Sequence, residues 1–242
     1  MNQSLALSNQ HPFLWEASLG VEHSFDKIIL KRYDFSIARF DKSLFEQFGI
    51  ASPAELNRAV DKRQAEFLAG RYAARQVLQT LGYCDIQIPV GQHRSPVWPE
   101  DIVASITHTS NTAICAAAAK DDVHYLGIDL ENHVSTKTAL EIKSGVLLEQ
   151  EERLLRTLPV AFEAAFTLIF SAKESVFKAL YPFVQEYFDF HAAALKSVCL
   201  DSGKISFELT EDLAPGFAAG TLVTGDFLIT SEIVFTSIYK HR

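Results

Sequence analysis

Two acidic residues, Asp129 and Glu131, stand two positions apart in the segment 126–131 (LGIDLE), where apolar residues alternate with glycine or acidic ones. This period of two is typical of a β-strand, so both carboxylates should point to the same face of a sheet. Like charges this close repel each other unless a positive charge lies between them, and hard cations take oxygen ligands. The spacing therefore indicates a cation site, although a lone Asp-x-Glu is also typical of a solvated strand face.

A third carboxylate, Glu174, lies in the segment 170–178 (FSAKESVFK), within a stretch that we expect to be helical. Lys178 follows Glu174 by four residues, so the two side chains share one helical face. In this arrangement Glu174 reaches a metal ion while Lys178 faces the same ligand. The alternative is structural: Ser171 and Glu174 fit a capping box, in which Glu174 would only stabilise a helix start.

Basic residues precede the acidic strand in the sequence. Arg63 and Arg71 lie in a long predicted helix, and Arg94 lies in the middle of a stiff, proline-rich loop. His108 follows a predicted strand and has hydroxyl-bearing neighbours, so it could donate to a phosphate or be an ordinary surface or core histidine. For the helical cations the alternative is a solvated helix flank.

The rest of the sequence predicts the elements that position these residues. Helices are expected at 43–48, 53–81, 147–158 and 162–180. Ser52 should cap the second of these helices, and Pro182 should close the last. Strands are expected at 27–40, 102–106, 113–119, 126–131, 192–200 and 204–209, with a hairpin of 220–224 and 227–236 around a turn at 224–226. The residues at 89–99 and 132–144 should be a loop and a polar connection, and the whole pattern predicts an α+β fold.

Composition narrows the possible functions. The chain has 242 residues, 48% of them hydrophobic and 18 of them Phe, enough for a large core. Its net charge of −8 argues against nucleic-acid binding, which requires a basic surface. Three scattered cysteines lack metal-ligand spacing and suggest reduced thiols. No apolar run is long enough to cross a membrane, and the first ten residues lack the pattern of a secretory signal, so we expect a cytoplasmic protein.

Taken together, four segments resemble the Sfp-type 4′-phosphopantetheinyl transferases, in the branch that contains the enterobactin synthetase component D proteins. These segments are 62–75 (KRQAEFLAGRYAAR), 96–109 (PVWPEDIVASITHT), 126–131 (LGIDLE) and 170–182 (FSAKESVFKALYP). Their order and spacing agree with the family over residues 60 to 190. The resemblance implies a monomer of two pseudo-symmetric α/β halves, 1–122 and 123–242, with coenzyme A bound in the cleft between them.

The resemblance also implies a role for each candidate residue. Mg²⁺, or Mn²⁺ in its place, would be held on the coenzyme A diphosphate by Asp129, Glu131 and Glu174. Lys178 matches the family lysine that lies on the phosphates, and His108 matches the histidine that contacts the nucleotide phosphates. Glu152 aligns best with the proposed general base, with Glu151 as its close rival. The cations that match family contacts to the adenosine and 3′-phosphate are Arg63, Arg71 and Arg94.

The implied reaction moves the 4′-phosphopantetheine group of coenzyme A to a serine of an apo acyl or peptidyl carrier protein and releases 3′,5′-ADP. A first alternative is a non-catalytic module that binds coenzyme A or a nucleotide. A second is purely structural, with Glu174 as a helix cap and the acidic strand as a wet sheet face.

Overall fold

The computed structural model describes residues 11–21 and 25–242. The first ten residues, on which the expected absence of a secretory signal is based, lie outside the described part. The chain divides into a first unit (Met1–Ile102 with Ile106–Ala119) and a second unit (Val103–Ser105 with Lys120–Arg242), each an assembly of helices and strands. The α+β class is confirmed. No helix in the described ranges is both long and apolar enough to span a bilayer.

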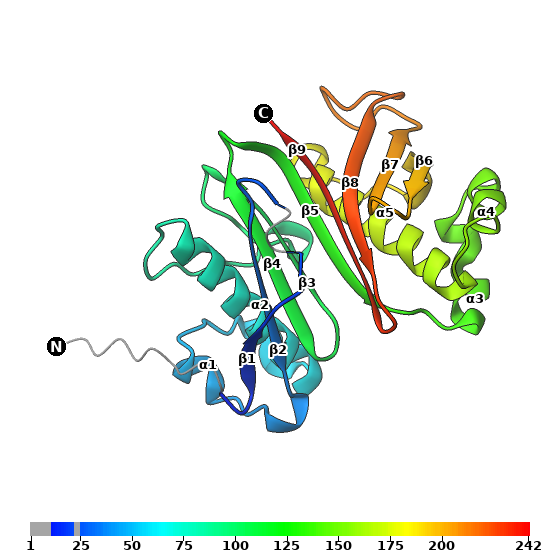
Figure 1. The fold of residues 1–242 in the computed structure, drawn as a ribbon. Coiled ribbons are helices and arrows are strands. Elements are labelled where there is room, and N and C mark those ends of the chain that lie inside the picture. Colours follow the sequence, from blue (N-terminus) through cyan, green and yellow to red (C-terminus); the bar gives the residue numbers. More distant parts are fainter. Residues whose placement is uncertain (1–10, 22–24) are drawn as a thin grey trace. The chain divides into compact units, whose positions relative to one another are not determined.

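A four-stranded sheet and one long helix make up most of the first unit, although Val103–Ser105 of strand β3 (Ile102–His108) group with the second unit (Figure 1). Helix α2 (Asp61–Thr80) packs against two of the strands, β2 and β4, and it can approach them closely because Ala65, Ala69 and Ala73 are fully buried. In sheet order the strands are β1 (Leu14–Ala17), β2 (Ile29–Phe35), β4 (Thr112–Ala119) and β3 (Ile102–His108). The shorter helices are η2 (Ile37–Arg39), α1 (Leu44–Gln47), η3 (Ala54–Arg58) and η4 (Gln92–Arg94).

The second unit contains a five-stranded antiparallel sheet covered by helix α5 (Phe162–Val184) (Figure 1). Helices α3 and α4 contact α5, and the apolar face of α5 fills the core with the sheet. In sheet order the strands are β5 (Val123–Asn132), β9 (Ile233–His241), β8 (Leu222–Ile229), β7 (Lys204–Leu209) and β6 (Ala193–Cys199). The remaining helices are α3 (Thr136–Val146), α4 (Glu149–Leu155) and η5 (Phe190–Ala192).

Gly127 sets how closely α5 lies on β5. A Cβ at this position would overlap the backbone carbonyl oxygen of Ser175 and lie 2.5 Å from the backbone nitrogen of Ala179. Only glycine allows two backbones to approach this closely. The face of β5 that carries Asp129 and Glu131 is therefore pressed against the helix that carries Glu174.

The predicted helix 53–81 is wrong at its start. A short 3₁₀ helix, η3, comes first, Ala59 and Val60 are extended, and α2 begins at Asp61. The Gln64 side chain donates a hydrogen bond to the Ala59 carbonyl at 2.7 Å, which gives that carbonyl a partner outside a continuous helix. Ser52 does not cap the long helix.

The predicted hairpin turn at 224–226 is also wrong. These residues lie inside β8, which pairs with β7 over Leu222–Asp226 and with β9 over Gly225–Ile229, and the chain turns instead between Ile229 and Ile233. Gly225 resembles a turn residue in sequence, but a Cβ there would overlap the carbonyl oxygen of Ser237 on β9. Glycine is required at this position because two strands approach closely, a need that a local sequence pattern does not reveal.

One helix was not predicted, and the end of another differs from the prediction. The polar stretch 132–144 contains α3, whose first turn is capped by Ser135 accepting a hydrogen bond from the Thr138 N–H at 3.2 Å. Pro182 lies inside the last turn of α5, which ends at Val184 and is followed by Gln185 in a left-handed conformation. A proline in the last turn removes only one backbone hydrogen bond, so the helix can continue past it.

Candidate active site

Asp129 lies on β5 and is only 3% exposed, while Glu131 is partly buried. The Lys178 ammonium on α5 donates a hydrogen bond to Asp129 Oδ1 at 2.7 Å. The alternative of a solvated strand face is therefore wrong for Asp129. Burial of a carboxylate is costly unless it is paired, and the ammonium supplies part of that compensation.

Glu174 lies one helical turn before Lys178 on α5. Burial raises the pKa of Glu174, the positive charge of Lys178 opposes that rise, and the negative charge of Asp129 adds to it. Burial, followed by the charge of Asp129, raises the pKa of Glu131 to about 7, against the opposing effect of Lys178. The structure thus brings three carboxylates and one lysine into electrostatic range of one another.

The capping-box alternative for Glu174 is wrong. Ser171 and Glu174 lie in the middle of α5, far from its start at Phe162. The Ser171 hydroxyl is fully buried and hydrogen-bonds to the hydroxyl of Thr236 on β9 at 2.9 Å. Ser171 therefore packs the helix onto the sheet, and Glu174 is available for another role.

The donor set suits a hard divalent cation by its chemistry. Asp129, Glu131 and Glu174 offer only carboxylate oxygens, which Mg²⁺ and Mn²⁺ prefer. Burial, together with the negative charge of Asp129, raises the pKa values of Glu131 and Glu174. Within residues 11–21 and 25–242, no three His, Cys, Asp or Glu side chains stand together as a ready-made metal cage. The residues fit a cation in type, but their side chains are not preassembled around one.

In the first unit, Arg63 and His108 lie together. Arg63 Nη1 is 3.1 Å from His108 Nε2, and because a guanidinium only donates, this nitrogen must be the acceptor. The His108 proton then lies on Nδ1, which is 4.0 Å from a carboxylate oxygen of Glu66. Burial raises the pKa of Glu66, while Lys62 and Arg63 oppose the rise. Glu66 is a site neighbour that was not predicted, and its signal in the sequence was its spacing of three residues from Arg63.

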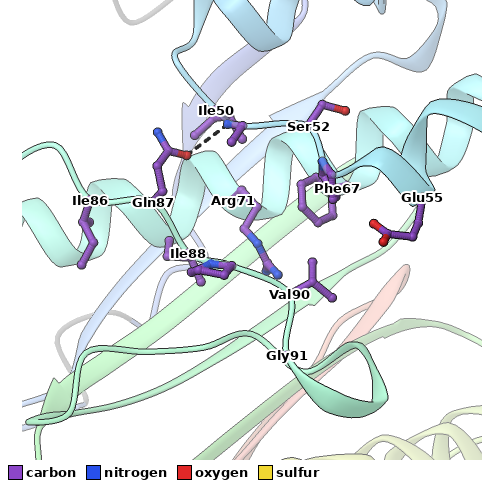
Figure 2. A pocket seen from close by; sticks show the side chains of 13 residues that line it. Ile50, Ser52, Glu55, Phe67, Arg71, Ile86, Gln87, Ile88, Val90 and Gly91 are labelled. Atoms are coloured by element: carbon purple, nitrogen blue, oxygen red, sulfur yellow. Dashed lines mark hydrogen bonds between the residues drawn. The ribbon is translucent and has the colours of Figure 1, made fainter.

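Arg71 lines a cavity of about 490 Å³ within the first unit (Figure 2). Only 8% of Arg71 is exposed, so the solvated-flank alternative is wrong for this residue. Its guanidinium lies 4.8 Å from the centre of the Phe67 ring, and within the described part of the chain its Nε has no hydrogen-bond partner. Burial lowers the pKa of Arg71 to about 10. A buried cation with so little compensation favours an anionic ligand in this cavity.

Arg94 is exposed at the end of η4, where Arg94 and His93 both have left-handed backbone conformations with φ of 63° and 53°. Gly91 is the last residue in sequence order that lines the Arg71 cavity, so Arg94 is not part of the lining. The structure therefore does not bring Arg94 into contact with that cavity, and Arg63 is similarly absent from its lining.

Glu152 and Glu151 differ sharply in environment. Glu152 accepts hydrogen bonds from Lys143 at 2.8 Å and Arg156 at 2.9 Å, and these bonds lower its pKa. A carboxylate with a lowered pKa is a weaker base. Glu151 is 1% exposed and pairs with Lys173 at 2.7 Å, so its oxygens are already engaged inside the protein.

Comparison with known families gives matches in both parts of the chain. Residues 52–118 match the family model of the 4′-phosphopantetheinyl transferase N-terminal domain. Residues 125–228 match the model of the 4′-phosphopantetheinyl transferase superfamily. The first match includes Arg63 and His108, and the second includes Asp129 and Glu174.

Individual relatives are moderately similar. The chain is 31% identical over 200 residues to the 4′-phosphopantetheinyl transferase Npt of Nocardia iowensis. The aligned region covers 78% of this chain and 88% of that protein. It is 40% identical over 126 residues to enterobactin synthase component D of Escherichia coli K12, which covers 52% of this chain. The chain thus spans 59% of the length of that Escherichia coli protein. It is 36% identical over 169 residues to the 4′-phosphopantetheinyl transferase Svp of Streptomyces mobaraensis, covering 69% of this chain and 66% of that protein.

Proposed function

Because the chain belongs to the 4′-phosphopantetheinyl transferase superfamily, we propose that it transfers 4′-phosphopantetheine from coenzyme A to a serine of an apo carrier protein. The phosphoanhydride bond of coenzyme A is broken, a phosphodiester forms with the serine oxygen, and 3′,5′-ADP leaves. The observation that carries the proposal is the electrostatic cluster of Asp129, Glu131, Glu174 and Lys178 between β5 and α5.

The cluster's chemistry suits phosphoryl transfer, which needs mainly positioning and charge neutralisation. Asp129, Glu131 and Glu174 would hold Mg²⁺, or Mn²⁺, on the diphosphate. When bound, the ion supplies positive charge that polarises the phosphate. Lys178 is held by Asp129 at 2.7 Å, so its remaining N–H groups can donate to phosphate oxygens and stabilise the charge on the leaving group.

We propose that residues 1–122 contribute the nucleotide contacts and residues 123–242 the metal ligands and catalytic residues. Arg63 and His108, 3.1 Å apart, would contact phosphates of the nucleotide. Arg71 would bind an anionic group from its cavity, and exposed Arg94 would reach the ligand from the loop before β3. Guanidinium groups suit these contacts because their fork matches phosphate geometry.

Glu152 is the proposed general base for the serine proton. Its pairing with Lys143 and Arg156 keeps it ionised, as a base must be, but also weakens it. The role therefore requires that substrate binding loosens these pairs. Glu151 is the poorer candidate, because Lys173 and backbone N–H groups occupy its oxygens.

The proposal is tested with Asp129→Asn and Glu174→Gln. We expect both variants to fold and to load carrier about 100-fold more slowly or worse, because each removes a ligand of the divalent cation whose positive charge would stabilise the transition state. The measurement is the intact mass of a panel of apo acyl and peptidyl carriers incubated with coenzyme A and Mg²⁺. Glu149→Gln is the matched control, since Glu149 is an exposed carboxylate on α4 whose ion pair is with Arg153. Loading by either variant at the parent rate would refute the metal-ligand assignment.

A second candidate is a non-catalytic coenzyme A or nucleotide binding module. The Arg71 cavity favours it, because this candidate anion site lies wholly within the first unit. Titration with coenzyme A in the presence of a chelator separates the two candidates when combined with the loading assay. Tight binding without loading of any carrier, even with Mg²⁺ restored, would favour the binding module.

We further propose that the protein acts as a monomer in the cytoplasm, as the family resemblance implies. Light scattering coupled to size-exclusion chromatography measures the mass in solution. A mass near 27.0 kDa is expected for the chain, and twice that value would refute the monomer.

A further inference from the structure

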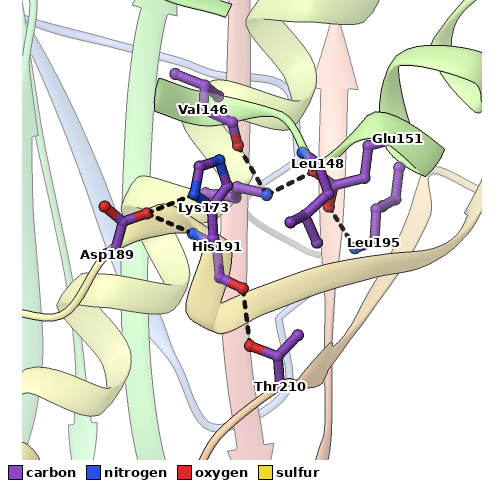
Figure 3. A network of polar contacts seen from close by, with 8 residues as sticks. All are labelled: Val146, Leu148, Glu151, Lys173, Asp189, His191, Leu195 and Thr210. Atoms are coloured by element: carbon purple, nitrogen blue, oxygen red, sulfur yellow. Dashed lines mark hydrogen bonds and ion pairs between the residues drawn. The ribbon is translucent and has the colours of Figure 1, made fainter. Parts of the chain in front are cut away.

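Lys173 and Glu151 form an ion pair inside the second unit (Figure 3). Their side chains are 1% and 0% exposed, and Lys173 Nζ donates to Glu151 Oε2 at 2.7 Å. The same ammonium donates to the backbone carbonyl of Val146 at 2.9 Å. Lys173 therefore ties α5 both to α4 and to the last residue of α3.

Glu151 is bonded just as fully. Its Oε2 accepts a hydrogen bond from the Leu148 N–H at 2.7 Å, and its Oε1 accepts one from the Leu195 N–H at 2.6 Å (Figure 3). Leu148 precedes α4 and Leu195 lies on β6, so one carboxylate fixes the helix start against the sheet. Two helices, one helix end and one strand meet at this single pair.

Such a pair is a poor means of gaining stability. Moving two charges out of water costs several kcal/mol each, and apolar residues of similar volume often give an equally stable core. What a fully bonded buried network specifies well is the relative arrangement of its elements. The arrangement that matters here is that of the residues next to the pair.

Each member of the pair directly precedes a candidate site residue. Successive residues of an α-helix point about 100° apart, so fixing Lys173 fixes the direction of Glu174. Glu174 then faces β5, within electrostatic range of Asp129 and Lys178. By the same geometry, fixing Glu151 directs Glu152 to the side of α4 where Lys143 and Arg156 bind it.

We propose that Lys173 and Glu151 are positioning residues of the transferase, which hold α5 and α4 in the rotation that presents Glu174 and Glu152 to the reaction. The inference rests on the proposed function. It assigns the pair no contact with substrate or metal.

Lys173→Met tests the inference, because it removes the ammonium and leaves Glu151 with its two backbone N–H donors. We expect a folded protein whose Mn²⁺ dissociation constant, measured without coenzyme A or carrier, rises about 10- to 100-fold, as for other residues that orient metal ligands. The kcat for carrier loading should fall by a similar factor while KM for coenzyme A stays unchanged. A folded variant with parent Mn²⁺ affinity and parent kcat would overturn the positioning role.

Ser171→Ala is the matched control, since Ser171 is a fully buried hydrogen-bonding residue of the same helix that contacts β9 instead of α4. It should lose stability without a change in Mn²⁺ affinity; equal losses of affinity in both variants would show a general effect of helix packing and overturn the inference.

If Lys173→Met does not fold, Glu151→Asp decides, because it keeps the charge but cannot reach all three donors. A folded Glu151→Asp variant with weakened Mn²⁺ binding supports the inference, and one with parent values overturns it. A parent protein that loads no carrier and binds no Mn²⁺ refutes the proposed function itself, and the positioning role falls with it.

Discussion

At the scale of single residues, Asp129, Glu131 and Glu174 place three carboxylates close together, with the ammonium of Lys178 as their positively charged neighbour. Three carboxylates lie where burial weakens their hydration, and Lys178 opposes the resulting rise in the pKa of both glutamates. The cluster is therefore under charge repulsion that a divalent cation would relieve. This repulsion should be visible in the stability of the protein without metal.

We predict that the contribution of Glu131 to the free energy of unfolding falls as the pH rises from about 4.5 to 7. The contribution is the difference between the parent and Glu131→Gln, measured with urea in the presence of EDTA. The pKa of Glu131 is about 7 in the folded protein and 4.5 ordinarily, so in this window the folded state binds more protons than the unfolded state. The stabilisation is complete below pH 4.5 and is lost as the pH passes the folded pKa. Saturating Mg²⁺ should restore stability most at high pH.

Glu131→Gln should flatten this dependence, because the amide does not titrate. Glu149→Gln, on the exposed side of α4, should leave the curve of the parent unchanged. If the parent and Glu131→Gln give parallel curves between pH 4.5 and 7, the carboxylates do not interact as described.

Much of this cluster could be predicted from the sequence, since a period of two on a strand and a spacing of four on a helix place side chains locally. The burial of Arg71 and the hydrogen bonds of Glu151 could not be predicted in this way. Arg71 shares its cavity with residues 50–53 and 86–91, and the Glu151 carboxylate accepts a hydrogen bond from Leu195, 44 positions away. Burial of a charged residue depends on segments that its own neighbourhood in the sequence does not contain.

At the scale of elements, the distance between β5 and α5 determines whether Lys178 can reach Asp129. The same kind of close approach explains why Gly225 was mistaken for a turn residue: in both places glycine serves contact with a distant backbone. The break between η3 and α2 likewise depends on a side-chain contact, that of Gln64 with Ala59. Local sequence patterns predict which segments are helices and strands. The two close glycine contacts and the break before α2 depend instead on packing against other residues.

Gly127→Ala should lower the free energy of unfolding by about 3 kcal/mol, because the added methyl group overlaps backbone atoms of α5 that cannot rotate away. The measurement is urea unfolding at neutral pH. Carrier loading should also fall, since α5 must shift away from Asp129.

Gly145→Ala is the matched control. Gly145 lies exposed in α3 with no atom within 4 Å of an added Cβ, so alanine there should stabilise the protein by about 0.5 to 1 kcal/mol. A Gly127→Ala variant as stable as the parent would mean that α5 does not lie on β5 as closely as described.

At the scale of the whole molecule, the candidate residues are divided between two units. The first unit carries the cations that we propose for the nucleotide, and the second carries the carboxylates and Lys178. If one coenzyme A molecule contacts both sets of residues, its binding should slow amide hydrogen exchange in both units. A ligand site within one unit would slow exchange mainly in that unit.

We predict that coenzyme A with Mg²⁺ slows amide hydrogen exchange together in 61–80 and 102–112 of the chain and in 126–132 and 171–179. At a ligand concentration of 100 times Kd, binding stabilises the bound form by about 2.7 kcal/mol, which corresponds to about 100-fold slower exchange for amides that exchange only after ligand release. With coenzyme A in EDTA, protection should weaken first in the two later segments, because the carboxylates then repel the diphosphate. Strand β7 (Lys204–Leu209), which carries none of the proposed contacts, provides the internal control. Protection limited to the first two segments in the presence of Mg²⁺ would remove the acidic cluster from the coenzyme A site and leave the binding-module candidate standing.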